Sequence, residues 1–211
     1  MVEHDERAAA EDPLIELPPD RPVLTLAELT NQVGTAPAGS RHAVTEAAGG
    51  AVALVLRRLT LGCKRPLVVI TPDRERAQQL MDDLSFVLPP TEHGPDEPRR
   101  VLELLASETS PYADVAADRG DAHQRLAALL ELASGQVPRV LVLNAAALTR
   151  KVLPGEAVLD HSQQLAVGTE LDRDETMQQL IEAGYVRAPL VEDPGTCAVR
   201  GALLDVWPSG A

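Results

Sequence analysis

The segment PLVVITPDRERAQQLMDDLSFV, residues 66–87, decides the fold class. Its first five residues are an apolar run with β-branched side chains, which predicts a buried strand. Thr71-Pro72-Asp73 follows and supplies a helix cap together with a first-turn proline. Apolar residues then recur at helical spacing, at Ala77, Leu80, Met81, Leu84 and Val87. A buried strand that leads into an amphipathic helix is one unit of an α/β fold with a mainly parallel sheet.

The same alternation extends on both sides of this unit. Three further stretches are rich in Leu or β-branched residues without polar alternation, as buried strands are. They lie at 42–45 (HAVT), 100–106 (RVLELLA) and 139–145 (RVLVLNA). A second helix is predicted at 121–134, where Gly135 stops it, and the proline-rich run at 89–99 predicts a surface loop. We therefore expect residues 41–162 to form an α/β domain.

After Pro154 the pattern becomes that of a small α+β unit at 163–211. Asp172 and Glu175 have the spacing of a capping box, and the helix that they start buries apolar residues and ends at Gly184. The buried residues are Met177, Leu180 and Ile181. Strands are predicted at 163–168, 185–192, 197–200 and 202–208, with a turn at Asp193-Pro194-Gly195. We expect this second domain to be incomplete, because the sequence ends within its sheet.

Composition and charge exclude several classes of function. The 211 residues carry 32 Asp and Glu against 19 Lys and Arg, a net charge of -13, which excludes a basic DNA-wrapping module. Aromatic residues make up 2% of the chain, too few for a base-stacking platform. Residues 1–40 are acidic and proline-rich, which predicts a flexible tail with a short helix at 24–33.

The reactive side chains give no pattern of a metal or redox site. Cys63 and Cys197 lie far apart without a CxxC motif, which is typical of two buried apolar groups in a reducing compartment. The five histidines have no ligand spacing, so no metal site is expected. The acidic start differs from a signal peptide, and no apolar run reaches the ~20 residues of a membrane span. We expect a cytoplasmic protein that makes no contact with a membrane.

The loop after the first predicted strand is where such a fold would hold a phosphate. A phosphate loop has the pattern GxxxxGK[ST], and residues 44–51 (VTEAAGGA) lack it. Glu46 would also repel a negative ligand. We expect no nucleotide cofactor and no catalytic residue in this chain, and we interpret Gly49 and Gly50 as permitting close packing at a helix start.

Three other positions carry side chains of types found in active sites, but none of them lies in a recognisable catalytic or metal-binding motif. Asp205, after a Leu-rich strand, is interpreted as a strand-edge residue and not as a metal ligand. Cys63 has no His nearby in sequence and is interpreted as structural. The polar loop at 108–112 follows a strand, a common position for function in α/β folds, but it also fits a simple turn.

Four stretches resemble the N-terminal, UvrB-like part of the bacterial transcription-repair coupling factors, the Mfd family. They are 65–88, 107–129, 141–154 and 190–210. The last, LVEDPGTCAVRGALLDVWPSG, is the most specific, because it is long and unusual in composition. The resemblance runs in order from about Arg41 to the last residue.

This resemblance implies a fold, a partner and the absence of a reaction. It implies a helicase-like α/β domain of the phosphate-loop NTPase type, followed by a truncated small α+β domain that docks onto UvrA. The nucleotide loop is degenerate in this family, and here Gly49 and Gly50 stand where Lys and Thr would be. The resemblance therefore implies a non-catalytic module that recruits UvrA to stalled RNA polymerase in transcription-coupled nucleotide excision repair. RNA polymerase and DNA would be bound only by parts of the family outside this chain.

Four residues are candidates for contact with UvrA. Arg200, in the step Val199-Arg200-Gly201, matches an arginine that contacts UvrA in the family, and Gly201 belongs to the same motif. An arginine fork binds carboxylates in bidentate fashion and is a frequent hot-spot type at protein interfaces. Tyr185 and Arg187 are further candidates, chosen for their position on a neighbouring strand.

Two alternatives remain open from the sequence. One is a small phosphate-loop-type nucleotide-binding enzyme, against which the glycines at 49 and 50 argue. The other is a stand-alone decoy that binds UvrA and competes with a complete coupling factor. Nucleotide titration distinguishes the first from a docking module, and the genomic context distinguishes the second.

Overall fold

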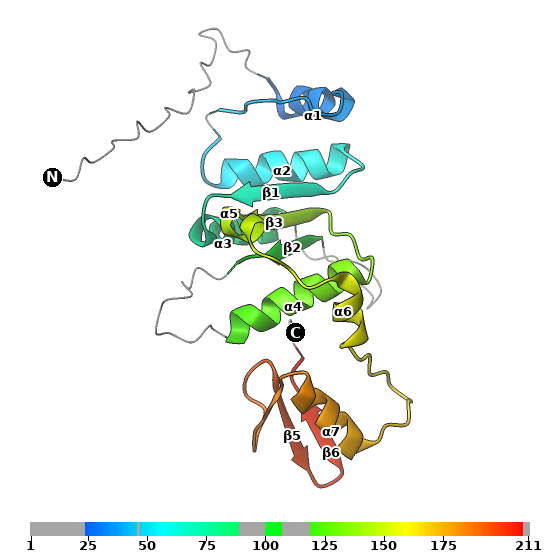
Figure 1. Cartoon of the computed structure of the whole chain (residues 1–211). Helices are drawn as coiled ribbons and strands as arrows, with labels where there is room; N and C mark the ends of the chain where they lie inside the picture. Colours follow the sequence, from blue (N-terminus) through cyan, green and yellow to red (C-terminus); the bar gives the residue numbers. More distant parts are fainter. Residues whose placement is uncertain (1–23, 46, 89–99, 107–118, 209–211) are drawn as a thin grey trace, which may run out of the picture.

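The computed structural model describes residues 24–45, 47–88, 100–106 and 119–208. Glu46 and the loops predicted at 89–99 and 108–112 lie outside these ranges, so their interpretation stays a prediction. In the described residues, an α/β unit with one sheet is followed by a smaller unit with a second sheet (Figure 1).

Three parallel strands form the first sheet, in the order β1-β3-β2. They are β1 (Leu67–Thr71), β2 (Val101–Leu104) and β3 (Val140–Asn144). Leu67 and Val101 both align with Val140, so the three strands begin at the same level. The α/β class, the parallel sheet and strands at these three places are confirmed.

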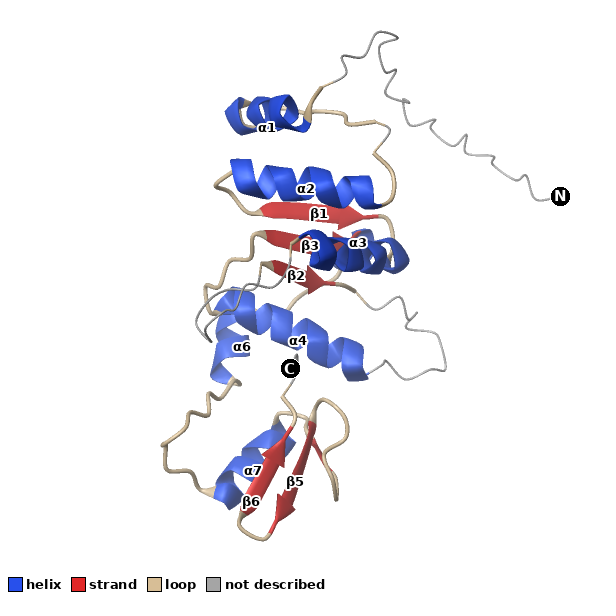
Figure 2. Cartoon of the chain, turned by 180° about the vertical axis from the view of Figure 1, so that it is seen from behind, coloured by secondary structure: helices blue, strands red, loops and turns tan. Residues whose placement is uncertain are grey.

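Helix α3 (Arg74–Val87) covers one side of this sheet (Figure 2). Asp73 caps it, as predicted, by accepting a hydrogen bond from the backbone N–H of Arg76 over 2.7 Å. Helix α2 (Gly50–Gly62) packs beside α3. The buried core on this side consists of Ala53, Ala77, Leu80, Leu84, Leu88, Val140 and Val142.

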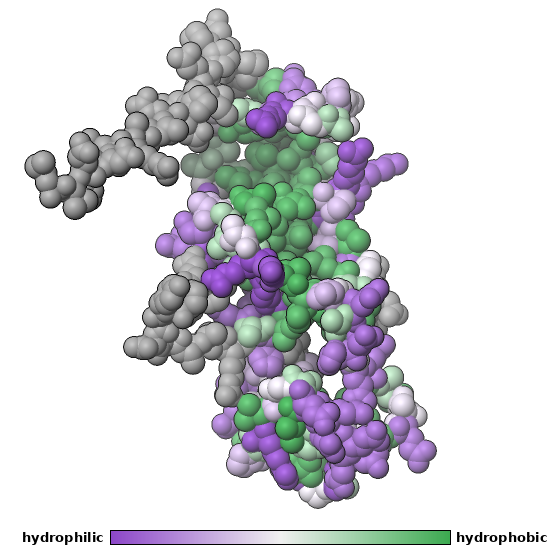
Figure 3. Space-filling model, viewed as in Figure 1, coloured by the Kyte–Doolittle hydropathy of each residue, from purple (hydrophilic) through white to green (hydrophobic). Residues whose placement is uncertain are grey.

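The opposite side of the sheet is covered less completely. Leu143 packs there with Ala106 and with Ala147 of the short helix α5 (Ala145–Thr149). Val68 and Ile70 of β1, in contrast, remain 58% and 54% exposed. Figure 3 shows an apolar surface over this part of the α/β unit.

The fully buried Asn144 joins the ends of β2 and β3. Its Oδ1 accepts hydrogen bonds from the backbone N–H of Ala106 (3.0 Å) and of Ala147 (3.2 Å), and its Nδ2 donates to the Ala106 carbonyl (3.3 Å). Because both polar atoms of the amide have partners, its burial leaves no uncompensated polar group. The same side chain caps α5.

Three more helices complete the α/β unit. The predicted helix at 24–33 is confirmed as α1 (Leu26–Thr35), and that at 121–134 as α4 (Arg119–Ala133). Arg74 and Asp121 form a bidentate ion pair between the starts of α3 and α4. Helix α6 (Gly155–Asp160) packs against α4. Helices α5 and α6 are not predictable from the sequence, because helices of five and six residues show no clear periodicity.

The second unit consists of helix α7 (Arg173–Glu182) on a three-stranded sheet. Its strands are β4 (Val186–Arg187), β5 (Thr196–Arg200) and β6 (Leu203–Val206), in the order β4-β5-β6. β4 runs parallel to β5, and β5 and β6 form an antiparallel hairpin. The last two strands predicted from the sequence are confirmed.

Three strand predictions differ from the structure. Residues 42–45 form no strand, and within the described residues β1 is an edge of the first sheet that pairs with β3 alone. Residues 163–168 form no strand, and their apolar side chains at strand spacing, Leu165 and Val167, remain exposed because no described element packs on them. The strand predicted at 185–192 is reduced to two residues, and Pro189, which lacks an N–H, follows shortly after them.

Candidate functional site

Helix α7 begins and ends at the predicted residues. Asp172 accepts hydrogen bonds from the backbone N–H of Asp174 (2.9 Å) and Glu175 (3.0 Å). These bonds lower the pKa of the Asp172 carboxyl, chiefly through the Glu175 N–H. The second half of the predicted capping box differs, because the Glu175 carboxylate accepts from the Gln179 side chain instead.

A Schellman motif closes the other end of α7. The N–H of Tyr185 donates to the Leu180 carbonyl (2.9 Å), and the N–H of Gly184 donates to the Ile181 carbonyl (3.0 Å). Gly184 has φ +94°, a conformation that a side chain disfavours. The motif turns the chain directly into β4.

Within the described residues, helix α7 covers one face of the second sheet and leaves the other face uncovered by a helix. Residues alternate between the faces along each strand, and paired residues share a face. Helix α7 packs on the face of Cys197, whose Sγ lies 3.5 Å from Sδ of Met177. Burial raises the pKa of the Cys197 thiol. Cys197 is thus a buried apolar group as predicted, whereas Cys63, at the end of α2, is only half-buried.

The other face, which we call the far face, carries Arg200. In register, Arg200 lies opposite Leu203 and Ala198 lies opposite Asp205. Alternation along the chain adds Trp207 to the same face. Leu203 is 63% exposed and Trp207 is 37% exposed. The far face is therefore defined by Arg200, Leu203, Asp205 and Trp207.

Arg200 is held by an ion pair within the far face. Its Nε donates to Oδ2 of Asp205 over 2.9 Å, and its Nη2 contacts the same oxygen. Both side chains are partly exposed, so the pair contributes little to stability, about 0–1 kcal/mol. It does fix the guanidinium plane, whose other N–H donors have no partner among the described residues. Asp205 lies on β6, an edge strand of the second sheet, as expected from the sequence, and its carboxylate is paired with Arg200.

Arg173, the first residue of α7, anchors the tip of the hairpin. Its Nη1 donates to the Gly201 carbonyl over 2.6 Å, while its Nε and Nη2 donate to Asp174. Gly201 starts the two-residue turn and has φ +60°. The helix and the turn beside Arg200 are thus connected by one guanidinium group.

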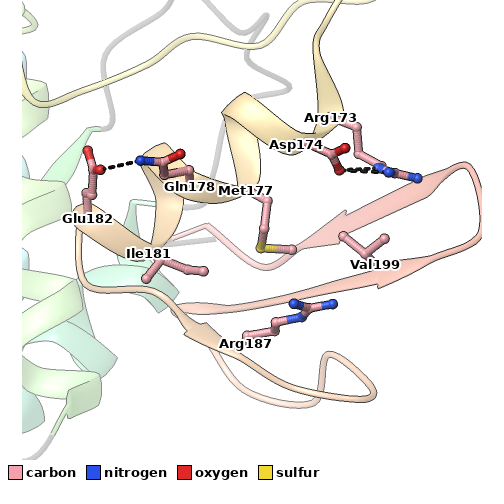
Figure 4. Close-up of a pocket in the computed structure, with 8 residues that line it drawn as sticks. All are labelled: Arg173, Asp174, Met177, Gln178, Ile181, Glu182, Arg187 and Val199. Atoms are coloured by element: carbon pink, nitrogen blue, oxygen red, sulfur yellow. Dashed lines mark hydrogen bonds and ion pairs between the residues drawn. The ribbon is translucent and has the colours of Figure 1, made fainter.

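Arg187 lies on the opposite face of this sheet from Arg200. It pairs in register with Cys197 and lines an open groove of about 470 Å³ under α7. Figure 4 shows Arg187 and Val199 across the groove from Met177 and Ile181. Ile181, predicted to be buried, is half exposed in this groove.

Tyr185 lies at the end of the sheet that faces the α/β unit. Its ring meets His123 of α4 edge to face, with 5.9 Å between centroids and 79° between planes. The structure therefore separates the four predicted partner residues. Arg200 and Gly201 lie together at the hairpin tip, whereas Arg187 and Tyr185 lie elsewhere.

Four residues around Arg200 are not among the candidates from the sequence, and one of them, Leu203, lies opposite Arg200 in the register of the hairpin. Trp207 is the one tryptophan of the chain, a signal that was available. Asp205 follows from the two-residue turn, which sets Ala198 opposite it and Arg200 diagonal to it. Arg173 carries no sequence signal, because its contact with Gly201 spans 28 residues.

Residues 44–51, interpreted from the sequence as a degenerate nucleotide loop, are described except for Glu46. Gly49 precedes α2 with φ +53° and makes no side-chain cap. The space around its Cα is open, so the interpretation of Gly49 as a close-packing residue is wrong, and its positive φ explains the glycine. A side chain at Gly50 would lie 3.9 Å from the Asp83 carboxylate, which adds a negative charge near this helix start.

The described part of the chain contains neither a group of metal ligands nor a helix that could cross a membrane. Across 24–45, 47–88, 100–106 and 119–208, no three His, Cys, Asp or Glu side chains are grouped to hold a metal ion. In the same ranges, no helix has the length and apolar character required to cross a membrane.

Comparison with known families identifies the second unit. The family model of the UvrB interaction domain matches residues 164–211. The second unit is therefore similar to a UvrB interaction domain, and we call it the interaction domain. This domain contains α7, both faces of the second sheet and the Arg200–Asp205 pair.

Transcription-repair-coupling factors match a longer part of the chain. The protein from Myxococcus xanthus is 42% identical over 170 residues, 81% of this chain and 14% of its own length. Those from Escherichia coli and Bacillus subtilis are 30% and 32% identical over 82% and 76% of this chain, and 14% and 13% of their own lengths. The resemblance to the N-terminal, UvrB-like region of this family is confirmed, and the chain spans about one seventh of these relatives.

Proposed function

We propose that the far face of the UvrB interaction domain docks UvrA and so recruits it to stalled RNA polymerase in transcription-coupled nucleotide excision repair. The observation that carries this proposal is the ion pair of Arg200 with Asp205, set between the exposed Leu203 and Trp207. The family match at 164–211 and the relatives among transcription-repair-coupling factors support it.

The chemistry of the far face suits a protein partner. Trp and Arg are enriched among residues that dominate binding energy at interfaces. Asp205 holds the Arg200 guanidinium in place, so less side-chain entropy is lost when a carboxylate of the partner binds it. Leu203 and Trp207 supply apolar contact area on either side.

We also propose that the α/β unit is a helicase-like domain that binds no nucleotide, and that the chain is non-catalytic and carries no cofactor. Supporting this, the loop before α2 lacks the Lys and the hydroxyl residue of a phosphate loop. Asp83 beside Gly50 would repel a phosphate group. RNA polymerase and DNA would be bound by other parts of the coupling factor.

The test is binding of the whole 211-residue chain to purified UvrA by biolayer interferometry at physiological salt. Arg200→Glu should weaken binding about tenfold or more, because a charge reversal at a hot spot costs above ~1.4 kcal/mol. Arg187→Glu makes the same charge change on the opposite face and serves as the matched control. Equal binding by the parent and Arg200→Glu would overturn the assignment of the far face.

Nucleotide titration by calorimetry tests the second part. We expect no heat of ATP binding to the parent chain. Micromolar ATP binding would overturn the non-nucleotide proposal and revive a phosphate-loop-type enzyme.

A further inference from the structure

The two units of the chain meet at His123. This residue lies on α4 of the α/β unit, and its ring packs against Tyr185 at the start of the interaction domain. The ring centroids are 5.9 Å apart and the planes are inclined by 79°, the edge-to-face geometry that aromatic rings prefer.

Gly195 provides a second contact with the same ring. A Cβ atom at Gly195 would lie 2.2 Å from Cε1 and 2.3 Å from Nε2 of His123. Both distances are far below van der Waals contact, so the imidazole occupies the space of the missing side chain. Gly195 is buried and has φ +76°. The glycine is therefore required by its backbone conformation and, independently, by His123.

The connection between the two units does not fix their orientation. Residues 161–172 contain no helix or strand, and every one of them is exposed. A segment without buried side chains has little to hold it in one conformation. The contacts that set the orientation must lie elsewhere, and His123 supplies two of them.

Gly195 also connects His123 to the far face. Its N–H donates to the Trp207 carbonyl over 2.9 Å, and its carbonyl accepts from Val186 N over 2.9 Å. Gly195 and Thr196 together face Trp207, the arrangement of a β-bulge with glycine at its first position. His123 therefore packs against Gly195, whose backbone is hydrogen-bonded to that of Trp207. This contact lies at the end of the sheet opposite the turn that follows Arg200.

We propose that His123, Tyr185 and Gly195 form a latch that fixes the direction in which the interaction domain presents its far face relative to the α/β unit. His123 and Tyr185 are positioning residues in this proposal. Tyr185, a candidate for partner contact from the sequence, acts inside the chain. The latch is independent of the proposed function, because it rests on contacts between the two units alone.

Backbone ¹⁵N relaxation of the whole chain tests the latch without any partner. In the parent, α3 and the strands β5 and β6 should share one rotational correlation time. In His123→Ala, the correlation time of β5 and β6 should fall below that of α3, because the interaction domain moves independently. Gln124→Ala changes a neighbouring exposed residue of α4 and should behave as the parent.

A double-mutant cycle separates the steric contact from the backbone strain at Gly195. Gly195→Ala should decouple the units in the parent, but it should add little in a His123→Gly background, where the space is free. Amide resonances of β5 and β6 that keep their dispersion show that the domain stays folded. A shared correlation time in His123→Ala, or an equal effect of Gly195→Ala in both backgrounds, would overturn the latch.

Discussion

Arg200 and Asp205 form an ion pair across the tip of a β-hairpin, with 2.9 Å between Nε and Oδ2. The two residues are diagonal neighbours, because Asp205 lies opposite Ala198 and Arg200 lies opposite Leu203. Both residues belong to the stretch 190–210, the most specific part of the sequence, and they lie beside the exposed side chains of Leu203 and Trp207.

The first prediction separates binding from stability at this pair. Asp205→Ala should leave the free energy of unfolding within about 1 kcal/mol of the parent, because both partners are partly exposed. It should weaken UvrA binding several-fold, since Arg200 then loses its fixed orientation. Urea unfolding and interferometry measure the two quantities. A large loss of stability with unchanged binding would contradict the assigned role of Asp205.

A second prediction concerns the buried amide of Asn144. Asn144→Ala leaves the N–H and carbonyl of Ala106 without their side-chain partner, and each unsatisfied buried group costs about 1–3 kcal/mol. We expect a total loss of about 2–4 kcal/mol in urea unfolding.

Asn144→Asp is the matched variant for this site. It keeps the acceptor for the N–H groups of Ala106 and Ala147, but an ionised carboxylate would face the Ala106 carbonyl. Its stability should recover at low pH, where the protonated acid donates as the amide does. Equal stability of Asn144→Ala and the parent would contradict the bonding described for this site.

Much of the α/β unit is predictable because its pattern is local. Asp73 caps α3 as the sequence predicts, and apolar spacing alone places Leu80 and Leu84 in the core. The predicted strand at 42–45 fails because a strand needs a neighbour, and pairing depends on the whole sheet. Local patterns do not contain that information.

Part of the candidate site is also predictable, because it depends on a local turn. A two-residue turn at Gly201-Ala202 determines which residues face Arg200, so Asp205 follows from the sequence once the turn is recognised. The register of β4 is set by packing, and it places Arg187 on the other face. The contact of Tyr185 with His123 joins residues 62 positions apart, which no local pattern predicts.

The third prediction is a pH dependence from Glu103. Burial raises the pKa of this carboxyl above 4.5, Arg74 opposes the rise, and Asp121 and Asp82 add to it. A raised pKa in the folded state means that the native protein binds more protons than the unfolded chain. The contribution of Glu103 is therefore most favourable below pH 4.5 and is lost as the pH rises through the raised pKa.

Glu103→Gln removes this titration. Its stability relative to the parent should increase as the pH rises from about 4 to about 7, as measured by urea unfolding at several pH values. A difference that stays constant or decreases over this range would contradict the raised pKa.

The fourth prediction concerns the hairpin turn. Gly201→Ala forces a side chain into a left-handed conformation at φ +60°, which costs about 1–2 kcal/mol. Gly34→Ala is a matched control within α1, where the space is open and φ is not positive. It should be neutral or stabilising by about 0.5–1 kcal/mol. Thermal unfolding measures both changes, and opposite signs for the two alanines are the expected result.

The measurement that tests the central claim most directly is UvrA binding by a pair of charge reversals on the two faces of the second sheet. We predict that Arg200→Glu loses affinity about tenfold or more while Arg187→Glu binds as the parent does. The reverse result, or equal affinity of the parent and Arg200→Glu, would contradict docking through the far face.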